Sequence, residues 1–181
     1  MSRTNKFRIA LFSVLLIGFT WLHCANPFAP ALADDNTGQG GILTDQENPE
    51  QVLRNFEFAY SFKDSLVYSE LLDSTFIFIS TDFNVSPPEP INWGRDQERR
   101  VGGRMFRFFS TLDLTFNEPV RSDTLLRDDL GEAIRVQETL TFTLTLDGGS
   151  NIPVFNGEVV FQFVLRDDER WYISRWEDKV I

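Results

Sequence analysis

The segment 134–146 constrains the fold more than any other part of this 181-residue chain. Apolar residues fill its even-numbered positions except 138, and hydroxylated residues fill the odd ones from position 139 onward. The apolar members are Ile134, Val136, Leu140, Phe142, Leu144 and Leu146, and the hydroxylated ones are Thr139, Thr141, Thr143 and Thr145. Because successive side chains of a strand point to opposite faces, this alternation predicts a long β-strand with one buried and one hydroxylated face.

Shorter alternating segments on both sides of it predict an antiparallel meander. Residues 112–118 alternate before it, and a second alternating segment follows the turn sequence Asp-Gly-Gly-Ser at 147–150. The alternating apolar residues there are Val159, Phe161, Phe163 and Leu165. A further turn at Asp167-Asp168 leads into a last strand over 171–176.

Helical signals lie before this sheet. Asn48-Pro49-Glu50 supplies an N-cap residue, a proline at the first helical position and an acid in the first turn. The apolar residues that follow share one helical face and are Val52, Leu53, Phe56, Ala59 and Tyr60. A second short helix is predicted over 65–72.

A strand over 75–80 and a third helix over 94–109 complete the predicted elements, and Gly102-Gly103 is a potential interruption of that helix. The prolines of segment 85–90 exclude a helix and predict a rigid loop. Helices followed by a run of antiparallel strands predict an α+β fold, with N-terminal helices packed on one face of a curved, mostly antiparallel sheet.

The first 23 residues are typical of a secretory signal peptide. Arg3, Lys6 and Arg8 form a basic region without an acid, and residues 9–22 follow without a charge. This uncharged run is shorter than the roughly 20 residues that a spanning helix needs. We therefore expect a signal peptide at 1–23, a flexible tether rich in Pro, Ala, Gly, Asn and Asp at 24–47, and one domain at 48–181.

Two processing sites compete at the end of that signal. Cys24, the only cysteine, lies where lipoprotein signals place the residue that is acylated, although His23 stands where a small residue is usual. The alternative is the A-x-A sequence Ala31-Leu32-Ala33, with cleavage before Asp34. We favour Cys24, which would anchor the exported protein to a membrane of the cell envelope, the outer membrane in a Gram-negative cell, with the domain facing the periplasm or the surface.

Charge and composition restrict the partners and the chemistry. The formal charge is −10, and loss of residues 1–23 would remove three basic and no acidic residues and so bring it to −13. Such a chain repels nucleic acid and anionic lipid surfaces. Residues 24–181 contain no histidine, so we expect no Ser-His or Cys-His site, no histidine metal site, no metal and no cofactor.

Two stretches resemble the nuclear transport factor two-like superfamily, whose members are also described as SnoaL-like or cystatin-like α+β cones. The first is Pro49-Glu50-x-Val52-Leu53-x-x-Phe56-x-x-Ala59-Tyr60-x-x-x-Asp64, and the second is Trp171-x-Ile173-x-Arg175-Trp176-x-Asp178. Polyketide cyclases, ketosteroid isomerase and scytalone dehydratase belong to this superfamily. The resemblance covers about residues 48–181 and implies a cone with a pocket at its open mouth and, in many members, a homodimer formed through the sheet.

The resemblance does not carry over the isomerase mechanism. The isomerase positions for the general base and the oxyanion donor fall near Ser80 and Phe56, which can neither take a proton at neutral pH nor donate to an oxyanion. The nearest substitutes are Asp82 and Tyr60. Solvation in a loop for Asp82 and core packing for Tyr60 are the interpretations that we favour, so no catalytic residue is predicted.

Other pocket candidates lie on the last strand and on the long alternating strand. Arg175 shares a predicted strand face with Trp171 and Ile173, so it points into the pocket as an anion-binding group or lies on the outer face. Glu138 interrupts the apolar row of 134–146. An ion pair between Arg175 and Glu138 would explain both residues without a ligand, and we favour it.

Two functions of different classes remain. The first is a non-catalytic, lipid-anchored module that binds an envelope protein or an apolar small molecule in a pocket lined mainly by Phe, Leu, Ile and Trp, with at most one or two charged groups. The second is a small carboxylate-dependent enzyme of the cyclase, isomerase or dehydratase kind, which two buried acids in one pocket would favour. Seven of the 18 phenylalanines are expected in the core: Phe56, Phe76, Phe78, Phe106, Phe142, Phe161 and Phe163.

Overall fold

The computed structural model describes residues 43–147 and 154–179. The elements in chain order are α2 (Pro49–Ser61), α3 (Ser65–Leu71), β1 (Leu72–Asp82), β2 (Glu89–Gly94), α4 (Arg95–Phe108), β3 (Leu112–Phe116), β4 (Arg121–Arg127), β5 (Ala133–Leu146), β6 (Phe155–Leu165) and β7 (Trp171–Lys179). The expected signal peptide, Cys24 and most of the expected tether lie outside the described residues. Among the residues described, no helix combines the length and the apolar character that a membrane crossing requires.

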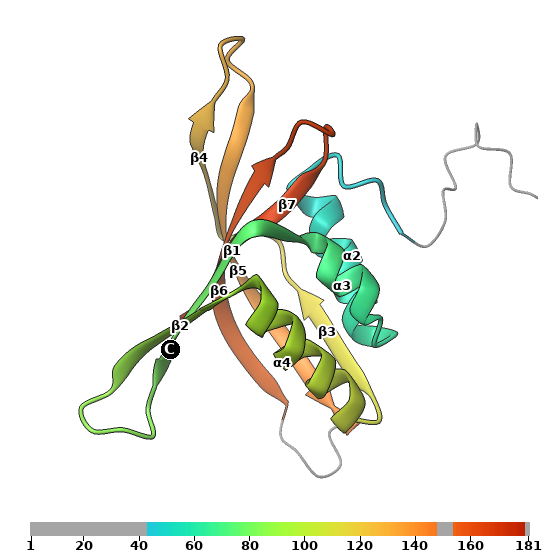
Figure 1. Ribbon diagram of the computed structural model, residues 1–181, viewed down its shortest axis with the longest axis vertical. Coiled ribbons are helices and arrows are strands. Elements are labelled where there is room, and N and C mark those ends of the chain that lie inside the picture. Colours follow the sequence, from blue (N-terminus) through green and yellow to red (C-terminus); the bar gives the residue numbers. More distant parts are fainter. Residues whose placement is uncertain (1–42, 148–153, 180–181) are drawn as a thin grey trace, which may run out of the picture. The chain divides into compact units, whose positions relative to one another are not determined.

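The seven strands form one sheet in the order β2-β1-β7-β6-β5-β3, with β4 also paired to β5. All neighbouring strands are antiparallel except β1 and β7, which are parallel. The three helices lie on one side of this curved sheet (Figure 1). The predicted α+β class, with helices packed on a curved and mostly antiparallel sheet, is confirmed.

The helices begin where the sequence indicates. Asn48 Oδ1 accepts the backbone N–H of Gln51 at 3.0 Å and caps α2. Asp64 caps α3 in the same way, through the N–H groups of Leu66 and Val67. Each cap satisfies donors that the first turn of a helix leaves without partners.

The contacts of the domain begin before Asn48. Asn55 on α2 accepts the backbone N–H of Thr44 at 2.8 Å, and the side chain of Gln46 donates to the carbonyl oxygen of Trp171 at 3.0 Å. Gln46 is itself buried. The described end of the predicted tether, residues 43–47, is therefore held against α2 and β7.

Six of the seven phenylalanines expected in the core are buried, and Phe142 differs. Phe142 is only partly buried and packs at the edge of the core. Its ring lies over Gly157 on β6, where a Cβ atom would meet Phe142 Cζ at 2.7 Å. The absence of a side chain at Gly157 therefore creates the space that the ring occupies.

The sequence did not predict β2 and β4. The interruption that was expected in α4 is absent. β2 contains Pro90, within the segment predicted to be a loop; β2 is an edge strand, where a proline without an N–H is tolerated. β4 has almost no buried side chain, so it carries no alternating signal. α4 runs through Gly102-Gly103 without a break.

Gly102 has a packing role in that continuous helix. A Cβ atom there would lie 2.6 Å from Cε1 of Tyr68, which belongs to α3. Glycine therefore lets the Tyr68 ring pack directly on the backbone of α4, and this contact brings α3 and α4 close together.

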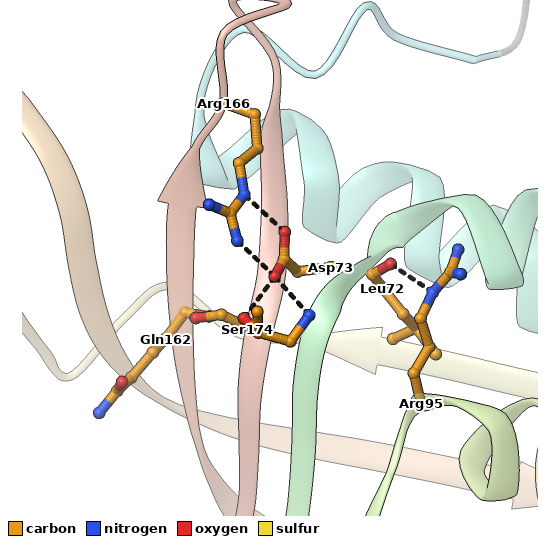
Figure 2. Close-up of polar contacts among 7 residues, drawn as sticks. Leu72, Asp73, Arg95, Gln162, Arg166 and Ser174 are labelled. Atoms are coloured by element: carbon orange, nitrogen blue, oxygen red, sulfur yellow. Dashed lines mark hydrogen bonds and ion pairs between the residues drawn. The ribbon is translucent and has the colours of Figure 1, made fainter.

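A polar cluster joins β1 to the turn before β7 (Figure 2). The Arg166 guanidinium donates two hydrogen bonds to the Asp73 carboxylate, at 2.6 and 2.7 Å. Burial alone would raise the pKa of Asp73, but the hydrogen bonds from Arg166 and Thr75 outweigh it and lower that pKa to about 2. Arg95, at the start of α4, donates to the carbonyl oxygens of Leu72 and Ser69 and so attaches α4 to the start of β1.

A β-bulge divides β7 into two halves. Gln162 of β6 pairs with Arg175, whereas the next residue, Phe163, pairs with Ile173, so Ser174 is the extra residue. A bulge reverses which side chains face inward. Before it Ile173 faces the core, and after it the even-numbered residues of β7 take that direction.

Candidate functional site

A cavity of about 570 Å³ opens among the helices and the inner face of the sheet. Residues from α2, α4 and every strand except β4 contribute to its wall. Most of the wall is apolar, and its aromatic members are Phe56, Tyr60, Phe78, Phe83, Trp93, Phe116, Phe142, Phe155, Phe161 and Trp176. The remaining apolar members are Val101, Met105, Leu114, Leu144 and Val159. A volume of this size suits a small organic molecule of one to three rings.

Glu98 on α4 is a buried carboxylate in this wall, with 4% of its surface exposed. The Tyr68 hydroxyl donates to its Oε1 at 2.5 Å, and Trp93 Nε1 donates to its Oε2 at 2.6 Å. Burial raises the pKa of Glu98; the two hydrogen bonds oppose the rise and the charge of Asp178 adds to it. Both oxygens of Glu98 thus already have protein donors.

Two tyrosines extend this arrangement toward the cavity. The Tyr60 and Tyr68 hydroxyls are hydrogen-bonded to each other, and Tyr60 also lines the cavity. Burial raises the pKa of both phenols above the ordinary value of 10, so both remain neutral at physiological pH. Tyr68 therefore lies behind the cavity wall, in contact with two residues of that wall, Tyr60 and Glu98.

Asp178, beyond the bulge in β7, is the second carboxylate of the cavity. Trp176 Nε1 donates to its Oδ1 at 2.7 Å, and the Ser80 hydroxyl on β1 forms a further hydrogen bond with it. Burial raises the pKa of Asp178, and these hydrogen bonds oppose the rise only in part. Asp178 is only partly buried, so a molecule in the cavity can reach it more easily than Glu98.

Exposed residues form the mouth of the cavity. Phe83 and Phe155 are exposed aromatic residues of the wall, and Glu158 and Lys179 add charge there. With Glu98 and Asp178 the wall contains four charged residues. The prediction of walls made mainly of Phe, Leu, Ile and Trp holds for Phe, Leu and Trp, but among the described residues no Ile lines the cavity, and the limit of one or two charged groups was wrong.

The structure brings only part of the sequence-predicted pocket together. Tyr60, Ser80 and Phe56 line the cavity. Trp171 and Ile173 are buried in the core and do not line it. Asp82 lies outside it as the last residue of β1, and not in a loop as expected; its carboxylate accepts the backbone N–H of Asn84 at 2.8 Å.

The predicted ion pair between Arg175 and Glu138 is wrong. Arg175 pairs instead with Glu177 on its own strand, at 2.7 Å. Glu138 forms a hydrogen bond with Ser122 of β4, and burial raises its pKa. The β7 bulge is the physical reason, because it directs Arg175 away from the face that holds Ile173.

Glu98 and Asp178 are the residues that the sequence analysis missed. Asp178 belongs to the terminal Trp-rich motif, but counting by twos across an unseen bulge gives it the wrong face. Glu98 lies four residues before Gly102 and eight before Phe106, on the buried side of α4. That i, i+4, i+8 spacing is the signal that could have found it. Across residues 43–147 and 154–179, no three His, Cys, Asp or Glu residues are grouped so that they could hold a metal ion.

Comparisons with known proteins identify the fold. No protein-family model and no curated protein sequence matches the chain. Similar solved structures include a candidate scytalone dehydratase from Novosphingobium aromaticivorans, with 13% identity, a TM-score of 0.57, and coverage of 73% of this chain and 80% of that one. Another is a nuclear transport factor two-like protein of unknown function from Shewanella oneidensis, with 16% identity, a TM-score of 0.54, and coverage of 71% and 93%.

A third structure, a cystatin-like protein of unknown function from Nostoc punctiforme, has 12% identity, a TM-score of 0.53, and coverage of 73% and 87%. Identities this low carry information about the fold and not about the activity. Together with the helices, the curved sheet and the cavity, they show that this chain has the fold of the nuclear transport factor two-like superfamily.

Proposed function

We propose that the domain binds a compact, largely apolar small molecule in its aromatic cavity, and that Asp178 accepts a hydrogen bond from a hydroxyl or similar donor of that molecule. The observation that carries the proposal is the cavity of about 570 Å³ with aromatic walls and the partly exposed carboxylate of Asp178. Ligand pockets of this size combine apolar walls with a few placed polar groups that fix orientation.

The polar groups of the cavity divide into occupied and accessible ones. Glu98 accepts from Tyr68 and Trp93 through both oxygens, so its role is to hold those two side chains. Asp178 is partly exposed to the cavity and is steadied by Trp176 and Ser80. A ligand donor therefore finds an acceptor on β7, with Phe and Trp rings around the rest of the molecule.

The matched pair 2-naphthol and naphthalene tests this assignment, because the two differ by one hydroxyl group. Quenching of tryptophan fluorescence reports binding, since Trp93 and Trp176 line the cavity. We expect 2-naphthol to bind about fivefold to tenfold more tightly, the effect of one hydrogen bond of about 1 kcal/mol or slightly more. Asp178→Ala should remove this preference. Asp123→Ala is the control, because Asp123 pairs with Arg121 on β4, which contributes no residue to the cavity wall.

Two results would refute the proposal. The first is the absence of saturable quenching by either compound. The second is a preference for 2-naphthol that survives Asp178→Ala, because the hydroxyl would then meet another group.

A second candidate function is acid-base catalysis on such a ligand. The specific observation in its favour is that Glu98 and Asp178 line one cavity and both have raised pKa values, with the charge of Asp178 adding to the rise at Glu98. Carboxyl groups shifted in this way are candidates for proton transfer. Asp178, as the accessible one, would be the group that removes a proton.

Exchange of the α-hydrogens of 2-tetralone with deuterium in D₂O separates binding from catalysis. General-base catalysis moves a C–H proton to the carboxylate and returns a deuteron to carbon, which nuclear magnetic resonance (NMR) detects as loss of the α-proton signal. Exchange accelerated by the protein and lost in Asp178→Asn would establish the catalytic function. Binding of 2-tetralone with no acceleration would leave binding as the function.

The place of this domain in the cell is a separate proposal, supported by the position of Cys24 after the uncharged run 9–22. We propose that Cys24 is acylated and anchors the protein to a membrane of the cell envelope. Mass spectrometry of the membrane fraction should find lipid on Cys24, and Cys24→Ala should release the protein. A soluble mature form that begins at Asp34 would contradict this.

A further inference from the structure

Four arginines of α4 form a positively charged surface on a protein whose net charge is −10. Arg99, Arg100, Arg104 and Arg107 line one hollow of about 500 Å³ between α3 and α4. Leu66 of α3 lines the same hollow, and Phe108 follows Arg107 at the end of α4 and borders a neighbouring hollow that shares Arg104 and Arg107. We call these six residues the basic–apolar surface.

Most of these guanidinium groups have no carboxylate partner. Arg99 approaches Asp96 at 3.9 Å, and Asp96 is the one acidic residue that lines the hollow. Arg100, Arg104 and Arg107 form no ion pair with any residue in the described part of the chain. Arg95, one turn earlier, shows the contrast, because it is used internally to hold the carbonyl oxygens of Leu72 and Ser69.

Large apolar side chains accompany this charge. Leu66 and Phe108 are 73% and 79% exposed, so neither side chain packs in the core of the domain. The turn before α3 is tied to the end of α4, because Lys63 Nζ donates to the carbonyl oxygens of Phe109 and Ser110. The apolar and cationic residues therefore belong to one fixed surface formed by α3, α4 and that turn.

The spacing of the charges distinguishes an extended partner from a single anion. From Arg99 to Arg107 a helix rises by about 12 Å, which exceeds the reach of one phosphate group. An array of anions beside an apolar layer matches both parts of the surface, because arginines bind lipid phosphates while Leu and Phe enter the boundary between headgroups and acyl chains.

We propose that the basic–apolar surface docks the domain on an anionic lipid bilayer. The negative charge of the whole chain predicts repulsion from such a bilayer, and the concentration of arginine on one helix provides the local attraction that overcomes it. This docking is independent of the cavity and of an acyl chain on Cys24. With an anchor in place, it would fix which side of the domain faces the membrane.

The test uses the full chain with Cys24→Ala, so that no acyl group contributes. Ser65→Cys in this background carries an environment-sensitive fluorophore beside Leu66, and Asp129→Cys, in the turn between β4 and β5, carries the same label as a control. The probes are vesicles of phosphatidylcholine alone and vesicles in which about one third of the lipid is phosphatidylglycerol. Emission at position 65 should shift to the blue only with the anionic vesicles, and rising salt should reverse it.

Charge variants test the arginines. Arg104→Glu with Arg107→Glu should lower affinity for anionic vesicles about tenfold or more, because each arginine near such a surface contributes substantially. Arg121→Glu with Arg127→Glu on β4 changes the total charge equally and should alter affinity by less than about twofold. Phe108→Ser should reduce the blue shift while the salt dependence remains. Circular dichroism melting checks that each variant is folded.

Three outcomes would overturn the proposal. One is an equal response to neutral and anionic vesicles, and another is an equal loss of affinity in the two charge-reversed pairs. The third is displacement of the vesicles by inorganic phosphate at a concentration too low to change the ionic strength, which would reveal a site for a soluble anion.

Discussion

Glu98 and Asp178 show how two carboxylates in one cavity can serve different purposes. Glu98 is 4% exposed and accepts one donor on each oxygen. Asp178 is partly exposed and lies on β7, the strand between β1 and β6 in the sheet. The first therefore organises Tyr68 and Trp93, and the second is placed to meet a ligand.

The raised pKa of Glu98 has a consequence for stability. A carboxyl whose pKa is higher in the folded state binds its proton more tightly there, so stability is complete below the unfolded pKa and falls as the pH rises through the folded one. We expect the wild type to lose stability as pH rises above about 4.5, the ordinary value for Glu, through the raised pKa. Glu98→Gln should lose less over this range, because a neutral amide never ionises.

Urea unfolding at several pH values measures this difference. The other shifted carboxyls are present in both proteins, and Asp178 is the one whose charge acts on Glu98. Glu47→Gln, at an exposed position, is the matched control and should follow the wild type. A Glu98→Gln variant with the same pH dependence as the wild type would mean that Glu98 is not desolvated in the fold.

Residue roles were the least predictable part from the sequence. Tyr60 could be placed near the pocket because the helical periodicity of α2 carries no irregularity. Asp178 and Arg175 exchanged faces because one extra residue, Ser174, reverses the period of two. Glu98 sits in a helix in which half of the residues are charged, so only its spacing relative to Gly102 and Phe106 distinguishes it from the solvated acid Asp96.

At the scale of elements, the signal that a strand leaves in the sequence depends on how many of its faces are covered. β5 was predicted nearly to its ends because one of its faces packs on the core. β4 is paired only with β5 and is exposed on both faces, so neither side required apolar residues. β2 was predicted as a loop because it contains Pro90. A proline excludes a central strand, but it is compatible with an edge strand such as β2.

Three substitutions test the facing of β5 and β6. Phe163 is fully buried, so Phe163→Ala should cost about 3–5 kcal/mol of unfolding free energy. Phe142 lines the cavity and is partly buried, so its replacement by Ala should cost about half as much. The hydroxyl of Thr141 accepts a hydrogen bond from the exposed Asn117 side chain, and Thr141→Ala should cost under about 1 kcal/mol. Equal costs in denaturant unfolding would mean that the strand register is wrong.

The Asp73–Arg166 pair tests the connection between β1 and the β6–β7 turn. The pKa of Asp73 in the folded state, about 2, lies below its ordinary value of 3.8. The stabilisation by the pair is therefore complete above about pH 3.8 and is lost as the pH falls toward about 2. Asp73→Asn should cost about 1–3 kcal/mol at pH 7, at the lower end because Arg166 is partly exposed. Chemical unfolding should show this cost shrinking at pH 3. Asp129→Asn, an exposed turn residue, should show none; a cost for Asp73→Asn that is constant with pH would contradict the pairing.

At the scale of the molecule, the fold class followed from the order of two periodicities, helical before 72 and alternating after 112. Such an order leaves one sheet face for the helices to cover, and the α+β arrangement results. The cavity itself was implied by resemblance, because no local pattern encodes how far helices and sheet separate. Its wall draws on residues from Phe56 to Lys179, so it exists only in the folded chain.

The indole N–H groups provide the most direct test that this cavity is a ligand-binding site. Trp93 and Trp176 line the cavity and donate to Glu98 and Asp178, whereas Trp171 is buried outside it. In an NMR titration with 2-naphthol, the signals of Trp93 and Trp176 should shift and saturate together while that of Trp171 stays in place. Leu144→Trp, which fills the cavity, should abolish those shifts. Equal shifts of the Trp93, Trp171 and Trp176 signals, or shifts that survive Leu144→Trp, would contradict binding in the cavity.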